Sequence, residues 1–146
     1  MMEDNYYKTI KWDDADKIMK NLVGCPIKQL PEIVSKQFSS LKSLYTIANW
    51  ENKSDIEIIN IIQNTIYLSN SIYIITDISY INNVGIFNLE MKDINRFIRI
   101  YFSLYSECLF NGDVFFISIT NKNILMFQHD GKLISYNLPL SYPDIG

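Results

Sequence analysis

Residues 113–136 read DVFFISITNKNILMFQHDGKLISY, which is the pattern of three consecutive β-strands. Each strand is rich in β-branched and aromatic residues, and turn-forming residues separate it from the next. The predicted strands are Asp113–Thr120, Ile124–His129 and Lys132–Tyr136. The connections are short, so neighbouring strands run antiparallel and form a C-terminal three-stranded meander.

The turns and the burial pattern support this interpretation. Residues 121–123 are polar, and Asp130-Gly131 places a glycine where a tight turn requires a positive φ. Residues 114–117 are apolar at every position, so both faces of that strand are expected to be covered. The sequence therefore predicts a central strand with a helix packed on one of its faces.

The clearest helical pattern lies just upstream, from Met91 to Leu109. Apolar residues recur there every three or four positions: Ile94, Phe97, Ile98, Tyr101, Leu104, Tyr105 and Cys108. Cys108 is accordingly interpreted as a small apolar side chain of the core. Ile100 and Phe102 interrupt the polar face, which indicates a helix covered on more than one side.

Capping and turn signals predict the first elements of the chain. A helix over Asp13–Leu22 would be capped by Asp13 or Asp14 and ended by Gly24 and Pro26. Pro31 would open a second helical turn that carries Ile33, Val34, Phe38 and Leu41.

The middle of the chain is predicted from similar signals. A weak alternation predicts a short strand over Leu44–Trp50. Ser54 and Glu57 form a capping-box pattern that would start a helix over Asp55–Gln63. A further strand is predicted over Ser71–Ser79, followed by a loop at residues 82–85.

These elements define an α+β fold in which helices pack a small, mostly antiparallel sheet with a C-terminal three-stranded meander. The chain has 146 residues, of which 48% are hydrophobic, and this size predicts a single domain spanning residues 1–146.

The composition excludes several classes of protein. The formal net charge is -3 and the isoelectric point about 5.1, so direct binding of nucleic acid through bulk positive charge is not expected. The N-terminus carries acidic residues where a secretory signal would carry basic ones, and the apolar runs at 56–62 and 72–75 are too short to cross a bilayer. We therefore expect a cytoplasmic protein with no membrane partner.

Sequence motifs for catalysis are scarce. His129 is the one histidine, and the sequence has no glycine-rich phosphate loop, C-x-x-C pair, calcium-binding loop or G-x-S-x-G element. We expect no cofactor, no metal site and no catalytic activity. One alternative stays open, in which His129 and Asp130 serve a small-ligand-binding or hydrolytic domain as a general base.

Residues 51–113 hold eight acidic residues against four basic ones, so this segment is more negative than the chain as a whole. Acidic residues near exposed aromatic or amide groups are typical of protein-binding surfaces, where aromatic rings anchor the contact and charge steers the encounter. The candidate partner-binding residues are Trp50, Glu51, Asp55, Asp77, Tyr80, Asn82, His129 and Asp130.

The segments Glu107–Val114 and Phe127–Gly131, in a small acidic α+β chain without catalytic motifs, resemble the immunity proteins of bacterial toxin systems, including those of contact-dependent growth inhibition. The resemblance implies a protein that binds a cognate toxin domain, often a nuclease, one to one and occludes its active site or substrate surface. The expected function is thus toxin neutralisation. A homodimeric structural subunit, suggested by the two-sided helix, remains an alternative.

Overall fold

The computed structural model describes residues 7–34, 41–66 and 68–140, without the side chains of residues 41–44. Within these ranges the strands form one sheet in the order β1-β4-β3-β5-β6-β7-β2, and all neighbouring strands are antiparallel. The strands are β1 (Tyr7–Ile10), β2 (Leu41–Thr46), β3 (Ser71–Ile75), β4 (Ile86–Glu90), β5 (Val114–Ser118), β6 (Asn123–Phe127) and β7 (Lys132–Asn137).

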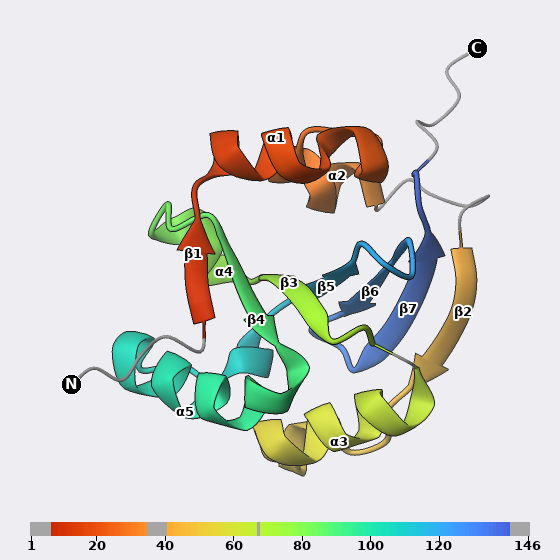
Figure 1. The fold of residues 1–146 in the computed structure, drawn as a ribbon. Helices are drawn as coiled ribbons and strands as arrows, with labels where there is room; N and C mark the ends of the chain where they lie inside the picture. Colours follow the sequence, from red (N-terminus) through yellow and green to blue (C-terminus); the bar gives the residue numbers. More distant parts are fainter. Residues whose placement is uncertain (1–6, 35–40, 67, 141–146) are drawn as a thin grey trace.

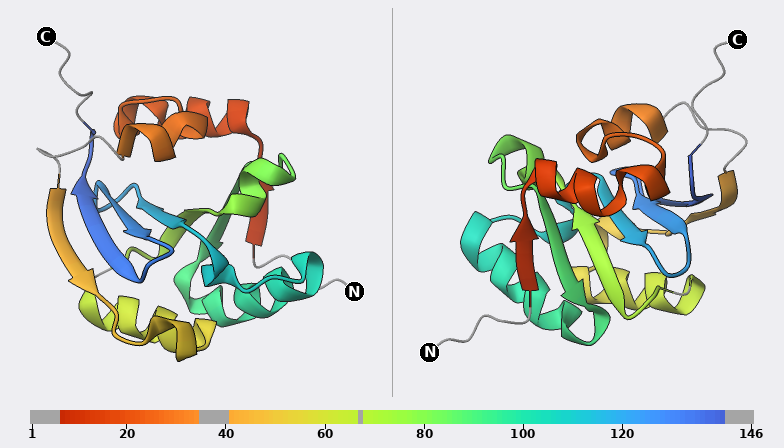
Figure 2. Two further views of the ribbon diagram at one scale, coloured as in Figure 1. Left: turned by 180° about the vertical axis from the view of Figure 1, so that it is seen from behind. Right: turned by 45° about the horizontal axis from the view of Figure 1, so that its top comes forward.

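Helices cover both faces of the sheet, as Figures 1 and 2 show. The α-helices are α1 (Trp12–Val23), α2 (Leu30–Val34), α3 (Asp55–Thr65), α4 (Asp77–Ile81) and α5 (Ile94–Tyr105). Short 3-10 helices are η1 (Ile27–Gln29), η2 (Trp50–Asn52), η3 (Met91–Asp93) and η4 (Leu109–Asn111). Helices α1 and α2 lie on one face and α3 and α5 on the other.

Alternate residues of each central strand enter two separate hydrophobic clusters, because successive side chains point to opposite faces. On β5, Phe116 packs in the cluster with α3 and α5, whereas Phe115 and Ile117 pack in the cluster with α1 and α2. All five residues of β5 are buried, and the strand lies between β3 and β6. The predicted α+β class, the C-terminal meander and the central strand are thus confirmed.

The helix predicted over Met91–Leu109 is shorter and differs at both ends. It begins as η3 and continues as α5, which stops at Ser106, whose φ is 57°. Cys108 lies beyond the helix and is exposed, so its assignment to the core was wrong. The prediction of cover on more than one side was also wrong, because Phe102 and Leu104 are each 56% exposed.

The segment predicted as a strand over Ser71–Ser79 divides in two. Strand β3 ends at Ile75, and α4 begins after Thr76, whose backbone N–H donates to the Ser79 hydroxyl at 3.1 Å and whose carbonyl accepts the Ser79 N–H at 3.0 Å. The β-branched run favoured an extended chain, but the Thr-x-x-Ser spacing provides a helix start at its end. This early stop places Asp77 at the end of the sheet.

Other boundaries also change. Helix α1 is preceded by Lys11 with no side-chain cap, and Asp13 and Asp14 lie in its first turn instead. Leu41 begins β2, which ends at Thr46, rather than closing a helical turn, and Trp50 belongs to η2. Phe38 lies outside the described residues.

The capping box of α3 and the left-handed Gly24 after α1 are confirmed. Strands β1 and β4 were not predicted from the sequence.

Candidate functional site

Polar loops gather at one end of the sheet because neighbouring strands alternate in direction. Strands β2, β3 and β6 end there, and β5 and β7 begin there, as their registers show: Ile75 pairs with Phe115, Val114 with Phe127, and Thr46 with Lys132. We call this end the acidic edge and define it by five residues, Asp77, Glu107, Asp113, His129 and Asp130.

His129 is held at the acidic edge by Asp113. One carboxylate oxygen of Asp113, Oδ1, accepts the backbone N–H of His129 at 2.8 Å and lies 3.0 Å from its ring Nδ1. The hydrogen bond and the negative charge of Asp113 raise the pKa of His129, and Asp130 and Asp77 raise it further. The imidazolium therefore persists to higher pH than in a free histidine.

Asp77 faces several carboxylates of its own sign. Burial raises its pKa first, and repulsion from Asp113 and Glu107 raises it further, whereas His129 lowers it. In the isolated chain, the positive charge of His129 therefore does not fully offset the repulsion that Asp113 and Glu107 exert on the Asp77 carboxylate. The remaining member, Asp130, is already engaged: its two oxygens lie 3.3 Å from the backbone nitrogen and 3.6 Å from Nζ of Lys132.

Asp55, a predicted partner-binding residue, has internal hydrogen-bond partners, and its contact with a partner stays a prediction. Its carboxylate accepts the backbone N–H groups of Leu109 at 2.7 Å and Phe110 at 3.2 Å. Burial raises the pKa of Asp55 more than these two hydrogen bonds lower it. Asp55 therefore anchors η4, in the connection that carries Glu107 and Asp113.

Trp50 lies beside the acidic edge, over the turn between β6 and β7. Its half-buried ring packs edge-on against Phe127, with ring centroids 5.5 Å apart. The ring also covers Gly131 so closely that a Cβ at that position would overlap it. Gly131 has a φ of 91°, so the turn requires glycine for its backbone as well as for space.

We expect Gly131→Ala to lower the free energy of unfolding by about 1–2 kcal/mol, because a left-handed non-glycine residue is strained. The added methyl group should also displace the Trp50 ring, which a shift in tryptophan emission would detect. The matched variant Gly112→Ala adds a methyl group against Asp77, with no left-handed φ to strain. An unchanged emission spectrum and urea midpoint in Gly131→Ala would contradict the described packing.

The other predicted residues differ in exposure. Glu51 in η2 and Asn82 after α4 are exposed, as the prediction requires. Tyr80 is only partly exposed and stacks on Trp12, with ring centroids 4.8 Å apart, against the core on the α1 side. Burial raises the pKa of Tyr80, and its buried hydroxyl has no hydrogen-bond partner. Tyr80 thus packs against the α1 side of the core, and its contact with a partner stays a prediction.

Asp113 and Glu107 were not among the predicted site residues, although both belong to the acidic edge. Asp113 had been assigned to the start of a strand and Glu107 to the end of a helix. Asp113 could have been identified from its position one residue before a fully apolar strand. The first residue of that strand, Val114, pairs with Phe127, the last residue of β6, so Asp113 lies close to the residues that follow β6.

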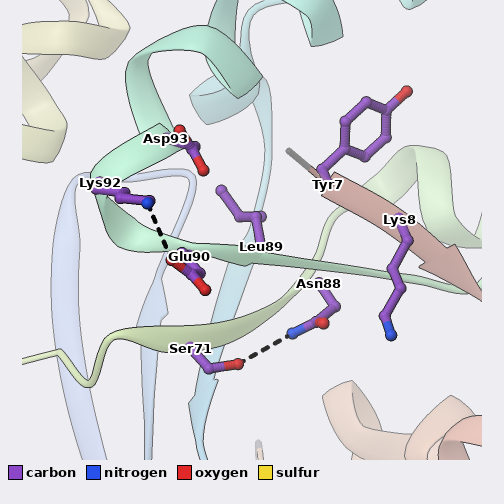
Figure 3. A pocket seen from close by; sticks show the side chains of 8 residues that line it. All are labelled: Tyr7, Lys8, Ser71, Asn88, Leu89, Glu90, Lys92 and Asp93. Carbon is purple, nitrogen blue, oxygen red and sulfur yellow. Dashed lines mark hydrogen bonds and ion pairs between the residues drawn. The ribbon is translucent and has the colours of Figure 1, made fainter. Parts of the chain in front are cut away.

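A concave region lies at the opposite end of β3 and β4 from the acidic edge and is shown in Figure 3. It has a volume of about 450 Å³ and is lined by Tyr7, Lys8, Ser71, Asn88, Leu89, Glu90, Lys92 and Asp93. Two pairs of its polar groups contact each other: Glu90 pairs with Lys92 at 3.6 Å, and the Asn88 amide donates to the Ser71 hydroxyl at 3.3 Å. The charges in this hollow are mixed, unlike those of the acidic edge.

Within the described ranges, no three His, Cys, Asp or Glu side chains are grouped so that they could hold a metal ion. In the same part of the chain, no helix is both long and apolar enough to span a membrane. Comparison of the chain with protein families, curated proteins and solved structures gave no match.

Proposed function

We propose that this chain is an immunity protein of a bacterial toxin system, which binds a basic toxin domain one to one and blocks its active site or substrate surface. The observation that carries the proposal is the set of carboxylates, Asp77, Glu107 and Asp113, gathered at one end of the sheet. A toxin that acts on nucleic acid presents basic groups to phosphates, and a surface rich in carboxylates can occupy those groups.

The shape of the acidic edge supports the same proposal. Asp113 directly precedes β5, and His129 and Asp130 lie in the tight turn between β6 and β7, so the paired strands limit the ordering that these three residues need on binding. Trp50 and the exposed Ile81, which is 73% exposed and ends α4, place apolar area near the charges. Interfaces of this kind combine apolar anchors with a charged surround.

A histidine held by a carboxylate also occurs in general-base sites, which was the basis of the hydrolytic alternative. Here the carboxylate on the ring is Asp113 rather than Asp130, and the imidazole is 75% exposed. An exposed base without surrounding walls is poorly suited to excluding water from a reaction. The arrangement favours a binding role for His129.

The proposal is tested with the product of the gene immediately upstream, which we expect to be a toxin domain. Co-expression with the present chain should abolish its toxicity, and the two proteins should co-purify. Sedimentation should show a monomer that forms a 1:1 complex. Persistent toxicity together with no complex would refute the proposal. A stable homodimer that excludes the toxin would favour the structural alternative, for which α5 offers the exposed Phe102 and Leu104.

A further inference from the structure

His129 occupies the centre of the acidic edge as its internal cation. Three carboxylates from different parts of the fold act on it: Asp113 before β5, Asp77 at the start of α4 and Asp130 in its own turn. Glu107, after α5, acts on Asp77. Lys132 pairs with Asp130. Near Trp50 in the chain, Glu51 of η2 and Lys53, which follows η2, add one charge of each sign. His129 is therefore the one group of this surface that can lose a positive charge near neutral pH.

The geometry allows this charge to change without moving the turn. The backbone N–H of His129 donates to Asp113 at 2.8 Å, and this hydrogen bond does not involve the ring proton that is lost. Ring Nδ1 can retain its proton toward the same carboxylate, 3.0 Å away, while Nε2 releases the other. Deprotonation therefore makes the acidic edge more negative by one charge while its backbone keeps the same shape.

We propose that His129 is a pH-dependent counter-ion that competes with the partner's basic side chains, so that loss of its proton strengthens docking at the acidic edge. This inference rests on the proposed function and names its regulation. The partner group is a guanidinium or ammonium, because these take the place of the imidazolium beside Asp77 and Asp113. The complex is tightest on the alkaline side of the histidine titration and loosens as the solution becomes acidic.

The direction in which affinity changes with pH follows from the contacts of His129. Its pKa lies above the ordinary value because of Asp113 first, so the ring is charged below that raised pKa and neutral above it. A bound cation near Asp113 disfavours the charged ring, and by linkage the charged ring disfavours the cation. Asp77 also has a raised pKa and would weaken docking at still lower pH, so its contribution must be separated from that of His129.

The test uses an oligoarginine peptide as a defined basic probe and the isolated chain. Affinity is measured at low ionic strength between about pH 5.5 and pH 8.5, the range in which histidine titrates. For the native chain we expect affinity to increase by about two- to fivefold across this range, the size of one exposed charge interaction. The affinity of His129→Gln should stay close to the value that the native chain reaches at alkaline pH, without the increase caused by loss of the histidine proton. Any change of affinity caused by the titration of Asp77 should remain.

Because His129 is the one histidine of the chain, its ring proton resonance reports its titration directly. Asp113→Asn should lower the observed pKa in the same experiment. An unchanged pH step in His129→Gln, or no binding of oligoarginine at any pH, would overturn the inference. Failure of the upstream gene product to bind would refute the toxin partner alone, since the probe measurement does not use it.

Discussion

Asp77→Lys is expected to weaken the complex with the toxin domain by about 100-fold, because a like-charge contact in an interface costs several kcal/mol. Asp77 is exposed and lies among Asp113, Glu107 and His129, so the new ammonium would face the partner's basic groups. The affinity is measured by calorimetry at physiological salt, and protection from the toxin by growth of co-expressing cells.

The fold should tolerate this substitution. Ionised Asp77 is disfavoured in the folded chain by burial and by its acidic neighbours, so removing its negative charge is not expected to lower the urea midpoint. Glu90→Lys is the matched control, since it makes the same change of net charge at the opposite end of β4. Equal loss of affinity in both variants would show that net charge, and not the acidic edge, governs binding.

Asp55→Ala is expected to lower the free energy of unfolding by about 2–4 kcal/mol, because two buried backbone donors lose their acceptor. These donors are the N–H groups of Leu109 and Phe110, at 2.7 and 3.2 Å from the carboxylate oxygens. Urea denaturation measures the loss, and hydrogen exchange at the two amides should accelerate. The connection that carries Glu107 and Asp113 should loosen, so affinity for the toxin should fall as well.

Two variants separate the anchoring role of Asp55 from its charge. Asp55→Asn retains one carbonyl oxygen as an acceptor and should recover part of the stability that Asp55→Ala loses. Glu51→Ala removes an exposed acid four positions earlier in the chain and should leave the free energy of unfolding unchanged within about 0.5 kcal/mol. A midpoint of Asp55→Ala equal to that of the native chain would contradict the anchoring role.

The fold was predicted from the sequence where local signals are strong. The meander rests on apolar strands separated by Asp130-Gly131 and a polar turn, and both its antiparallel order and the burial of β5 follow from them. The capping box at Ser54 starts α3 as predicted. The predicted ends of strands and helices were wrong where one local preference opposed another. At Thr76, for example, the start of a helix interrupts a run of β-branched residues that favours a strand.

The candidate site was only partly predictable. The sequence pointed to His129, Asp130, Asp77 and Trp50, and the structure places all four at or beside the same end of the sheet. Asp55 and Tyr80 carried the same signals of charge and aromaticity, but both are used internally. Residue type shows that a side chain can bind a partner, whereas burial decides whether it is free to do so.

By itself, the sequence determined the elements whose causes are local: the C-terminal strands, the glycine turn and the capped helix. The tertiary structure alone decided that Asp77 and Asp113 lie near His129 and that Glu107 lies near Asp77. That arrangement depends on β3 pairing with β5, although some 40 residues of chain separate Ile75 from Phe115. Pairing between distant strands is selected by burial on both faces of the whole sheet, which no local pattern of residues specifies.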